Sequence, residues 1–334
     1  PNLAPAIRQA MLAAAIRLGE SIHYRSAGTV EFLFDAATGQ FYFLEVNTRL
    51  QVEHGVTEAV TGIDLVEWMI LLGAEALPLL DGVVIKPQGA AIQARIYAEN
   101  PAKNFQPSSG LLTHVGFPDE VRVETWIESG AEISAYYDPM LAKIIAYADT
   151  REQAIDQLKT ALDKTLLYGI ETNLDYLRQI LSSERFRHGQ ITTRLLADFG
   201  YQAHTMEVLS PGLQTTVQDY PGRLGYWHVG VPPSGPMDSL AFRLANRLLD
   251  QPDGLAGLEI TLAGPTLKFH CDSRIAVCGA QIEIWLNDEV LPCWQAHTVK
   301  AGSVLRFGRI NGAGSRVYLA VQGGIQVPEY LGSR

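Results

Sequence analysis

Polar side chains occupy every second position in the stretch FLEVNTRLQVEHG, which covers residues 43–55. In an extended chain, residues two apart lie on one face. Carboxylate and amide oxygens are the ligands that Mg²⁺ prefers, and a guanidinium matches the shape of a carboxylate-like or phosphate anion. The spacing therefore predicts one row of side chains that binds magnesium and an oxyanion: Glu45, Asn47, Arg49, Gln51 and Glu53.

A further acidic residue is expected beside this row. GTVEFLFD and FYFLEVN are rich in β-branched and aromatic residues, and AATGQ between them holds a glycine suited to a turn. The resulting hairpin would bring Glu31 close to Glu45, so that these carboxylates and Asn47 form a site for Mg²⁺ or Mn²⁺. With Glu53 as a possible general base, the set indicates phosphoryl transfer to a small acid. Spacing alone leaves open the alternative of cross-strand ion pairs without a ligand.

The composition excludes some classes of function. With 334 residues, 47% of them hydrophobic, the chain can bury about two or three cores. Its formal net charge of −10 leaves no basic surface for nucleic acid, and no apolar run is long enough to cross a membrane. The sequence has no N-terminal signal pattern and no CxxC pair, so we expect a cytoplasmic protein with reduced thiols at Cys271, Cys278 and Cys293.

Helices and strands alternate through the first part of the chain. Apolar spacing predicts helices over 3–18 and 61–76, and alternation predicts a strand over 91–99, AIQARIYAE. Thr150 begins a capping box before a helix over 151–167. These elements predict an α+β fold for this part of the chain.

Beyond Glu207 the sequence changes to glycine, proline and short alternating strands, which predicts a sandwich or a barrel. One helix, over 239–249, follows PPSGPMD. Asp238 would cap this helix, although its unpaired N–H groups could instead receive an anion or a carbonyl oxygen. Weaker candidates for binding in this part are Arg223, Tyr226, His228 and Gln322.

Several stretches of the first two hundred residues closely resemble biotin carboxylase, an ATP-grasp enzyme of the biotin-dependent carboxylases. They are GTVEFLFD, FYFLEVNTRLQVEHGVTEAVTGIDLVEW, AIQARIYAE, SAYYDPMLAKII and GIETNLDYLRQIL. The match to FLEVNTRLQVEH is long and specific, which favours a ligand site over the ion-pair alternative.

The resemblance implies roles in binding and in proton transfer. Glu31, Glu45 and Asn47 would hold Mg-ATP. Glu53 would deprotonate bicarbonate for attack on the γ-phosphate of ATP, and Arg95 would lie beside biotin and phosphate. Arg49 would also stabilise the charge that develops on biotin. Bicarbonate itself would be bound by three residues: Arg49, Gln51 and, through its backbone, Val52.

Neighbouring residues are expected to have structural roles. His54 would be a packed residue rather than a catalyst. Gly55 stands where the family usually has proline, which loosens the backbone beside Glu53. Asp138 and Lys143 fall in a family-like segment and would be structural or contact another domain.

The last part resembles the KipA-like family, also called allophanate hydrolase subunit 2, whose members carry cyclophilin-like β-barrels. The match rests on PGLQTTVQDYPGRLGYWHVGVPPSGPMDSLAFRLANRLL, GLEITLAGPTLKF and YLAVQGGIQVPEYLGSR. The predicted fold class is therefore multidomain α+β. Its parts are the C-terminal half of an ATP-grasp domain (1–82), an α+β biotin carboxylase C-terminal domain (83–200), a linker (201–206) and part of a β-rich, cyclophilin-like carboxyltransferase region (207–334).

The order of the two parts resembles the urea carboxylase family. This implies a biotin-dependent ligase that uses Mg-ATP and bicarbonate and transfers a carboxyl group to urea, giving allophanate. Biotin would be carried by a biotinyl domain absent from this chain, allophanate hydrolase would be a pathway partner, and a homodimer is possible. Both ends are expected to be cut, and the isolated chain would then be inactive, because the nucleotide-clamping half is missing.

Three other functions stay open. The acceptor could be guanidine, or an acyl-CoA as in another biotin-dependent carboxylase. The chain could be a KipA-like binding or regulatory module, although such a module would not need the row of ligands. It could also be a 5-oxoprolinase component, against which the biotin carboxylase-like half argues.

Overall fold

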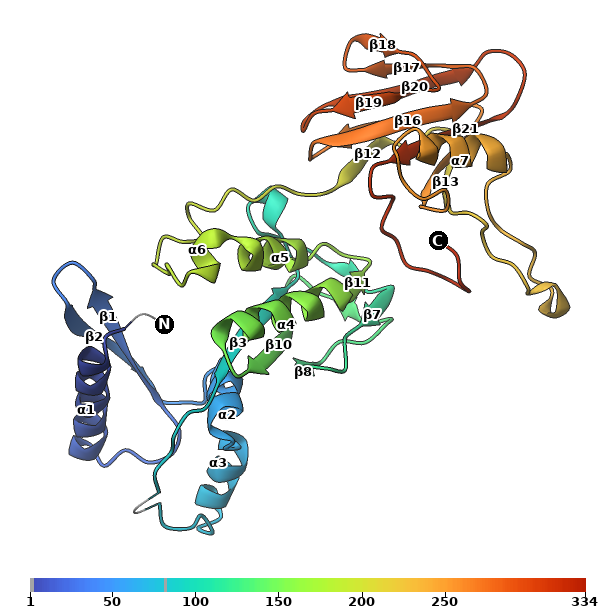
Figure 1. The fold of residues 1–334 in the computed structure, drawn as a ribbon. Helices are drawn as coiled ribbons and strands as arrows, with labels where there is room; N and C mark the ends of the chain where they lie inside the picture. The colour runs from blue at the N-terminus through green and yellow to red at the C-terminus, as the bar shows by residue number, and fades with distance from the viewer. Residues whose placement is uncertain (1–2, 81–82) are drawn as a thin grey trace. The chain divides into compact units, whose positions relative to one another are not determined.

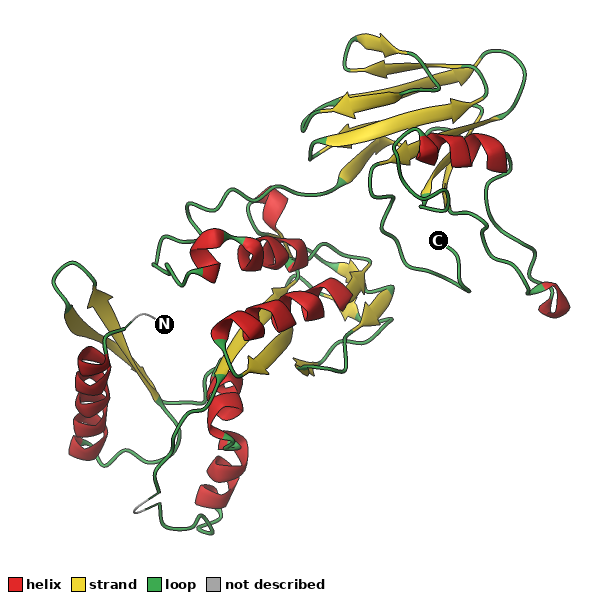
Figure 2. Ribbon diagram, viewed as in Figure 1, coloured by secondary structure: helices red, strands yellow, loops and turns green. Residues whose placement is uncertain are grey.

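The computed structural model describes residues 3–80 and 83–334. The chain divides into two compact units, Pro1–Tyr201 and Gln202–Arg334, each of which is described by itself (Figure 1). Figure 2 shows that helices and strands are mixed in the first unit, whereas strands predominate in the second. No helix among the described residues is both long enough and apolar enough to cross a bilayer.

The first unit begins with a hairpin and three helices. The elements are α1 (Pro5–Ser21), β1 (Thr29–Asp35), β2 (Gln40–Asn47), α2 (His54–Thr61) and α3 (Leu65–Gly73). Asp64 caps α3, because its Oδ1 accepts a hydrogen bond from the Glu67 N–H at 2.8 Å. Only two of the described residues between 3 and 80 are buried, Gly55 and Glu58, and both lie on α2.

The rest of the first unit is built on a three-stranded antiparallel sheet in the order β3-β10-β8. Its strands are β3 (Ala90–Tyr97), β10 (Met140–Ala148) and β8 (Arg122–Thr125). Helix α4 (Arg151–Lys164) begins with the capping box of Thr150 and Gln153 and packs on β3 and β10. Alternation along β3 gives Ala94 and Ile96 to the core and leaves Gln93 and Arg95 on the other face.

Short elements complete this unit. They are β4 (Glu99–Asn100), a 3₁₀ turn (Pro101–Lys103), β5 (Gln106–Pro107), β6 (Gly110–Leu111), β7 (His114–Gly116), β9 (Glu132–Ile133), β11 (Leu166–Tyr168), α5 (Leu174–Ser182) and α6 (Glu184–Arg187). The helix predicted over 151–167 ends earlier, at Lys164, and the next residues pair with β7 as β11.

The second unit contains two five-stranded antiparallel sheets, in the orders β12-β15-β20-β17-β18 and β13-β14-β21-β16-β19. Their strands are β12 (Met206–Ser210), β13 (Gln214–Gln218), β14 (Gly257–Thr261), β15 (Thr266–Phe269), β16 (Ser273–Gly279), β17 (Ile282–Leu286), β18 (Glu289–Leu291), β19 (Ala296–Val299), β20 (Val304–Ile310) and β21 (Arg316–Val321). A 3₁₀ turn (Trp227–Val229) and α7 (Ser239–Arg247) interrupt them, and α7 packs on β16 and β21.

Both sheets of the second unit contribute to one apolar core. Ile260 on β14 and Leu319 on β21 come from one sheet, and Leu267 on β15 and Leu305 on β20 come from the other. Neither sheet closes on itself within the described residues. The sandwich alternative predicted from the sequence therefore fits, whereas the cyclophilin-like barrel is not confirmed.

Candidate functional site

The hairpin places the two predicted metal ligands directly opposite each other. Glu31 on β1 pairs with Glu45 on β2. The Asn47 side-chain amide donates to Glu31 Oε1 at 2.7 Å and to Glu45 Oε1 at 3.1 Å. A shift in register follows Glu31, so that the next pair is Phe32 with Phe43. The β-bulge interrupts the alternation between Phe43 and Glu45. Beyond it the register is regular, so Glu45 and Asn47, two positions apart, share one face.

The extended row predicted over residues 43–53 is therefore only partly correct. Strand β2 ends at Asn47, and α2 begins at His54. Arg49, Gln51 and Glu53 lie in the connection between them and not on the strand. The alternation of polar and apolar residues in this connection mimics a strand, but tertiary contacts decide its path.

Of these three side chains, only that of Gln51 contacts the acidic pair among the described residues. The Gln51 amide donates to Glu31 Oε1 at 3.0 Å, which brings it to the acidic pair. Arg49 is exposed, and its guanidinium makes only a long contact, 3.4 Å, with the Leu50 carbonyl oxygen. It has no ion pair among the described residues, so its charge is available to an anion.

Glu53 forms an ion pair with Arg95 on β3. The distance from Arg95 NH2 to Glu53 Oε2 is 2.5 Å, and 52% of the Glu53 side chain and 36% of the Arg95 side chain are exposed. At this exposure the pair contributes little to stability, about 0.2–1 kcal/mol. Its consequence is geometric, because it fixes one carboxylate oxygen of Glu53 and leaves Oε1 without a hydrogen bond among the described residues.

A lysine of β10 contacts the backbone of the same turn. Lys143 Nζ donates to the Val52 carbonyl oxygen at 3.0 Å. His54 Nδ1 lies 2.8 Å from the Gln51 carbonyl oxygen, and the His54 N–H donates to that same oxygen at 3.2 Å. His54 is thus a half-buried residue that closes the turn, as the sequence predicts.

A network of ion pairs connects α2 with strands β8 and β10. Glu58 Oε2 is 2.7 Å from Arg122 NH1, Arg122 also pairs with Glu124, and Glu124 pairs with Lys143. Burial disfavours the charged carboxylate of Glu124, but hydrogen bonds and charge from Lys143 and Arg122 outweigh it and lower the pKa of Glu124. Desolvation also works against the charge on Arg122, yet Glu58 and Glu124 outweigh it and raise the pKa of Arg122.

The donor set around the hairpin fits a hard divalent cation. Two like charges directly opposite each other destabilise a sheet unless a cation or hydrogen-bond donors compensate. Here Asn47 and Gln51 supply such donors to the carboxylates. Among the described residues, no cluster of three or more His, Cys, Asp or Glu side chains could hold a metal by itself. Two carboxylates suit Mg²⁺, which typically completes its shell with waters and substrate phosphates.

The candidates in the second unit are less well organised. Asp238 is confirmed as the cap of α7, since its Oδ1 accepts from the Ala241 N–H at 3.0 Å. The Arg223 N–H donates to Ser234 Oγ at 2.7 Å, which fixes a loop rather than presents a site. Tyr226 and His228 lie in or beside the short turn over 227–229. None of these residues lines the pocket that this unit forms beside β12 and β16.

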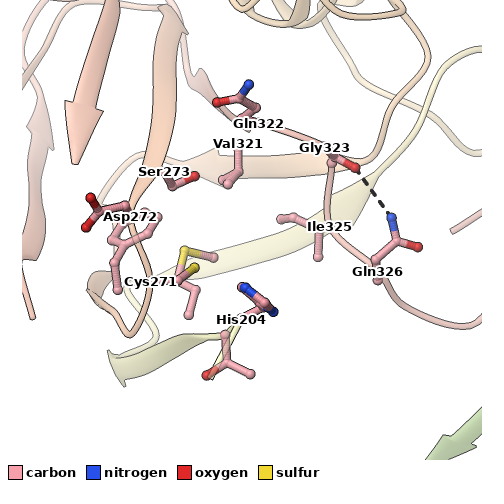
Figure 3. Close-up of a pocket in the computed structure, with 13 residues that line it drawn as sticks. His204, Cys271, Asp272, Ser273, Val321, Gln322, Gly323, Ile325 and Gln326 are labelled. Carbon is pink, nitrogen blue, oxygen red and sulfur yellow. Dashed lines mark hydrogen bonds between the residues drawn. The ribbon is translucent and has the colours of Figure 1, made fainter. Parts of the chain in front are cut away.

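That pocket, with a volume of about 600 Å³, lies beside β12, β16 and the chain after β21 (Figure 3). Gln322, His204 and Cys271 are among its lining residues. Its acidic residue, Asp272, already pairs with Lys300 at 2.7 Å and accepts from the Ala301 N–H at 2.9 Å. Figure 3 shows the Gln326 side-chain amide donating to the Gly323 carbonyl oxygen within the chain after β21. The polar groups here largely satisfy one another.

Three protein families match consecutive parts of the chain. Residues 1–79 match the ATP-binding domain of the carbamoyl-phosphate synthase L chain, 93–198 the biotin carboxylase C-terminal domain, and 229–334 the carboxyltransferase domain, subdomains A and B. A solved structure of the 2-oxoglutarate carboxylase biotin carboxylase domain dimer from Hydrogenobacter thermophilus, in complex with MgADP and bicarbonate, is similar to 60% of the chain. It covers 46% of that chain, with 37% identity and a TM-score of 0.56. The first unit is thus similar to biotin carboxylase domains, and the last part of the chain to carboxyltransferase domains.

Relatives that match the whole chain narrow the class. Urea amidolyase of Saccharomyces cerevisiae is 48% identical over 100% of the chain, and the structure of Kluyveromyces lactis urea carboxylase is 52% identical over 100% of it, with a TM-score of 0.90. Over its whole length the chain is similar to parts of urea amidolyase and urea carboxylase. It spans 18% of the length of the first relative and 30% of the second.

Sequence reasoning missed the contacts that anchor the turn. The sequence predicts a structural or domain-contact role for Lys143 and assigns no role to Glu58, Arg122 and Glu124. A signal was present in RVET, residues 122–125, where charged residues alternate with apolar ones on β8. Glu58 gave no such signal, because its importance depends on which side of α2 faces the sheet.

Proposed function

We propose that the chain is the part of a urea carboxylase that activates bicarbonate with Mg-ATP and begins the carboxyltransferase. The observation that carries this proposal is the convergence of Glu31, Glu45, Asn47 and Gln51 at the end of the hairpin, with the Glu53–Arg95 pair on the next turn. In a related enzyme the corresponding domain was solved with MgADP and bicarbonate.

In this proposal Glu31 and Glu45 bind the magnesium ion, with Asn47 beside them. When bound, the ion supplies positive charge that neutralises the phosphates of ATP. The Asn47 amide donates to both carboxylates, which keeps them together. Arg49, Gln51 and the backbone of Val52 bind bicarbonate. The fork of Arg49 is suited to an oxyanion of this size.

Glu53 is the proposed general base and Arg95 its partner. Arg95 holds Glu53 Oε2, so that Oε1 can accept the proton of bicarbonate. The deprotonated oxygen then attacks the γ-phosphate of ATP, giving carboxyphosphate and ADP. Carboxyphosphate then breaks down to CO₂ and phosphate, and the phosphate takes the proton from the ureido nitrogen of biotin. That nitrogen bonds to CO₂, so that biotin, on a separate domain, carries the carboxyl group. Arg49 and Arg95 would stabilise negative charge as this transfer occurs.

Urea is the proposed final acceptor, and allophanate the product. The proposal rests on relatives named urea amidolyase and urea carboxylase, which match the chain over its whole length. Guanidine is the second candidate acceptor, because like urea it is planar and carries NH₂ groups on one central carbon. One relative is named urea amidolyase and another urea carboxylase, and an enzyme that cleaves the carboxylated product would link the two activities. These names support allophanate hydrolase as a pathway partner.

The remaining proposals concern organisation. We propose domain boundaries at 82/83 and 200/201, a linker over 201–206, a cyclophilin-like architecture over 207–334, a homodimer and a cytoplasmic location. A biotin carboxylase domain of a relative is described as a dimer, which supports the homodimer.

The test uses a full-length protein that contains this chain, with a biotinylated carrier domain. ATP cleavage is measured with bicarbonate present or absent, while urea, guanidine or an acyl-CoA is supplied in turn. We expect cleavage that requires bicarbonate and rises most with urea. If ATP cleavage rose with guanidine alone, guanidine and not urea would be the acceptor. Cleavage independent of bicarbonate would refute the carboxylase proposal itself.

A further inference from the structure

Three residues paired across the sheet form a row beside the connection between β2 and α2. This row contacts two consecutive residues of the connection, Val52 and Glu53. Lys143 on β10 is paired with Arg95 on β3 and, on its other side, with Glu124 on β8. Arg95 binds the side chain of Glu53, and Lys143 binds the carbonyl oxygen of Val52. The row thus contacts the proposed base and the peptide that precedes it.

The contact from Lys143 fixes the direction of the turn. The Val52 carbonyl belongs to the planar peptide unit that ends at Glu53, so its orientation determines how the Glu53 backbone leaves the turn. Only 8% of Lys143 is exposed, and an ammonium in such a position must be paired. Its partners are the Val52 oxygen at 3.0 Å and the carboxylate of Glu124.

The same row is anchored to α2, which follows the turn. Glu124 pairs with Arg122, and Arg122 with Glu58 on α2. Glu58 is 7% exposed, and its Oε1 accepts from the Leu65 N–H at 2.8 Å. The network therefore holds the turn from both ends, at Val52 and at the helix after Glu53.

Gly55 permits this close approach of α2 to the sheet. A Cβ at residue 55 would lie 2.4 Å from Cδ1 of Ile145 on β10. The sequence suggested that glycine at this position loosens the backbone. In the structure Gly55 is buried, and it lets the start of α2 pack against β10.

We infer that Lys143 is a positioning residue for the proposed bicarbonate site: it orients the Val52–Glu53 peptide, with Glu124, Arg122 and Glu58 as its support. The inference rests on the proposed function for its effect on activity, but the orientation itself can be measured without activity. Removing the ammonium would free the Val52 carbonyl while leaving the Glu53 carboxylate chemically intact. Misplacement of a reacting group by about 1 Å can reduce the rate by about 10²-fold.

The experiment compares Lys143→Met with wild type in the full-length protein. Hydrogen exchange of amides 52–58 is followed by mass spectrometry, because the His54 and Val56 N–H groups close this turn. We expect exchange about tenfold faster there, with no change in β3 or β10. In the activity assay, KM for bicarbonate should rise and kcat fall by about 10- to 100-fold together, while KM for ATP stays constant.

Lys164→Met is the matched control. Lys164 lies in the same unit and also pairs with a carboxylate, that of Glu120, but both side chains are more than half exposed and far from the turn in sequence. It should leave exchange at 52–58 and both KM values unchanged. If Lys143→Met does not fold, Glu124→Gln keeps the lysine but removes its support, and should give a smaller effect of the same kind.

Two results would overturn the inference. Unchanged exchange at 52–58 would show that Lys143 does not position the turn. Faster exchange throughout the first unit, with equal changes in both KM values, would show that Lys143 only stabilises the fold. A wild type without bicarbonate-dependent ATP cleavage would refute the proposed function instead, and the exchange measurement would then decide the positioning role alone.

Discussion

Residues 3–80 and residues 202–334 differ sharply in how their elements are held. Among the described residues of the first region only Gly55 and Glu58 are buried, and Leu33, Phe43 and Leu44 of the hairpin are more than half exposed. The second region encloses a core drawn from both of its sheets: Ile260, Leu267, Phe269, Ile275, Val277, Ile284, Val299, Leu305, Val317 and Leu319 are among its members.

This difference teaches how the proposed site is positioned. The hairpin and its following turn lack an apolar core of their own, so hydrogen bonds and ion pairs from Asn47, Arg95 and Lys143 fix the functional side chains. In the second region apolar packing fixes the backbone, and polar groups mostly cap and brace it. A single polar substitution should therefore affect function in the first region and stability in the second.

The largest expected effect is on the proposed base. Glu53→Gln keeps the size of the side chain but removes its ability to accept a proton from bicarbonate. We expect bicarbonate-dependent ATP cleavage to fall by about 10²- to 10⁴-fold, with Mg-ATP binding unchanged in a direct titration. Glu120→Gln, at an exposed ion pair in the same unit, is the control and should keep full activity. Undiminished cleavage in Glu53→Gln would remove Glu53 from the mechanism.

A pair of leucines tests the contrast in packing directly. Leu267 on β15 is 0% exposed, whereas Leu44 on β2 is 61% exposed. Leu267→Ala should lower the free energy of unfolding of the second unit by about 2–5 kcal/mol, because it leaves a cavity. Leu44→Ala should change the hairpin by less than about 0.5 kcal/mol. Hydrogen exchange resolved by segment measures both, and equal losses would contradict the comparison.

A buried hydroxyl tests how much polar hydrogen bonds contribute to the stability of the second region. Tyr318 is fully buried; its hydroxyl donates to Glu259 Oε2 at 2.9 Å and accepts from the Asp238 N–H at 2.7 Å. Burial raises the pKa of this hydroxyl, so it stays protonated as a donor. Tyr318→Phe leaves the Asp238 N–H without its acceptor and removes one of two donors to Glu259 Oε2, the other being the Met237 N–H. It should cost about 1–3 kcal/mol in denaturant unfolding. Tyr42→Phe, at an exposed hydroxyl on β2, should be nearly neutral.

The smallest expected effect is a difference in acid sensitivity. The folded pKa of Glu124 lies below its ordinary value of 4.5, so its ionised form stabilises the fold above about pH 4.5. This stabilisation is lost as the pH falls through the folded pKa. Hydrogen bonds from Arg247 and Arg243 lower the pKa of Asp253 in the second unit to about 2, so its pairs should persist at lower pH.

Digestion with pepsin between pH 4 and pH 2 would compare these two networks. Residues 52–65 should become susceptible at a higher pH than the segment around α7. Glu124→Gln, which has no carboxylate to protonate, should reduce the pH dependence at residues 52–65. Simultaneous cleavage of both segments at every pH would show that the two networks are equally sensitive to acid.

Much of the candidate site could be predicted from the sequence, but for different reasons at different residues. Glu31, Glu45 and Asn47 follow from a hairpin, whose turn and alternation are local properties. Glu53 was placed on the wrong element, because the alternation beyond Asn47 reads as a strand although the chain turns into α2 there. The closed barrel is not confirmed, since alternating strands with frequent turns are equally typical of two packed sheets.

By itself the sequence determined the elements whose causes are local. Capping by Thr150 and Asp238 and the alternation along β3 need only residues a few positions apart. The tertiary structure alone decided the contacts that join Glu53 to Arg95, 42 residues away, and Val52 to Lys143, 91 residues away. Such contacts depend on how α2 packs against the sheet, and sequence spacing carries no information about distances across that contact.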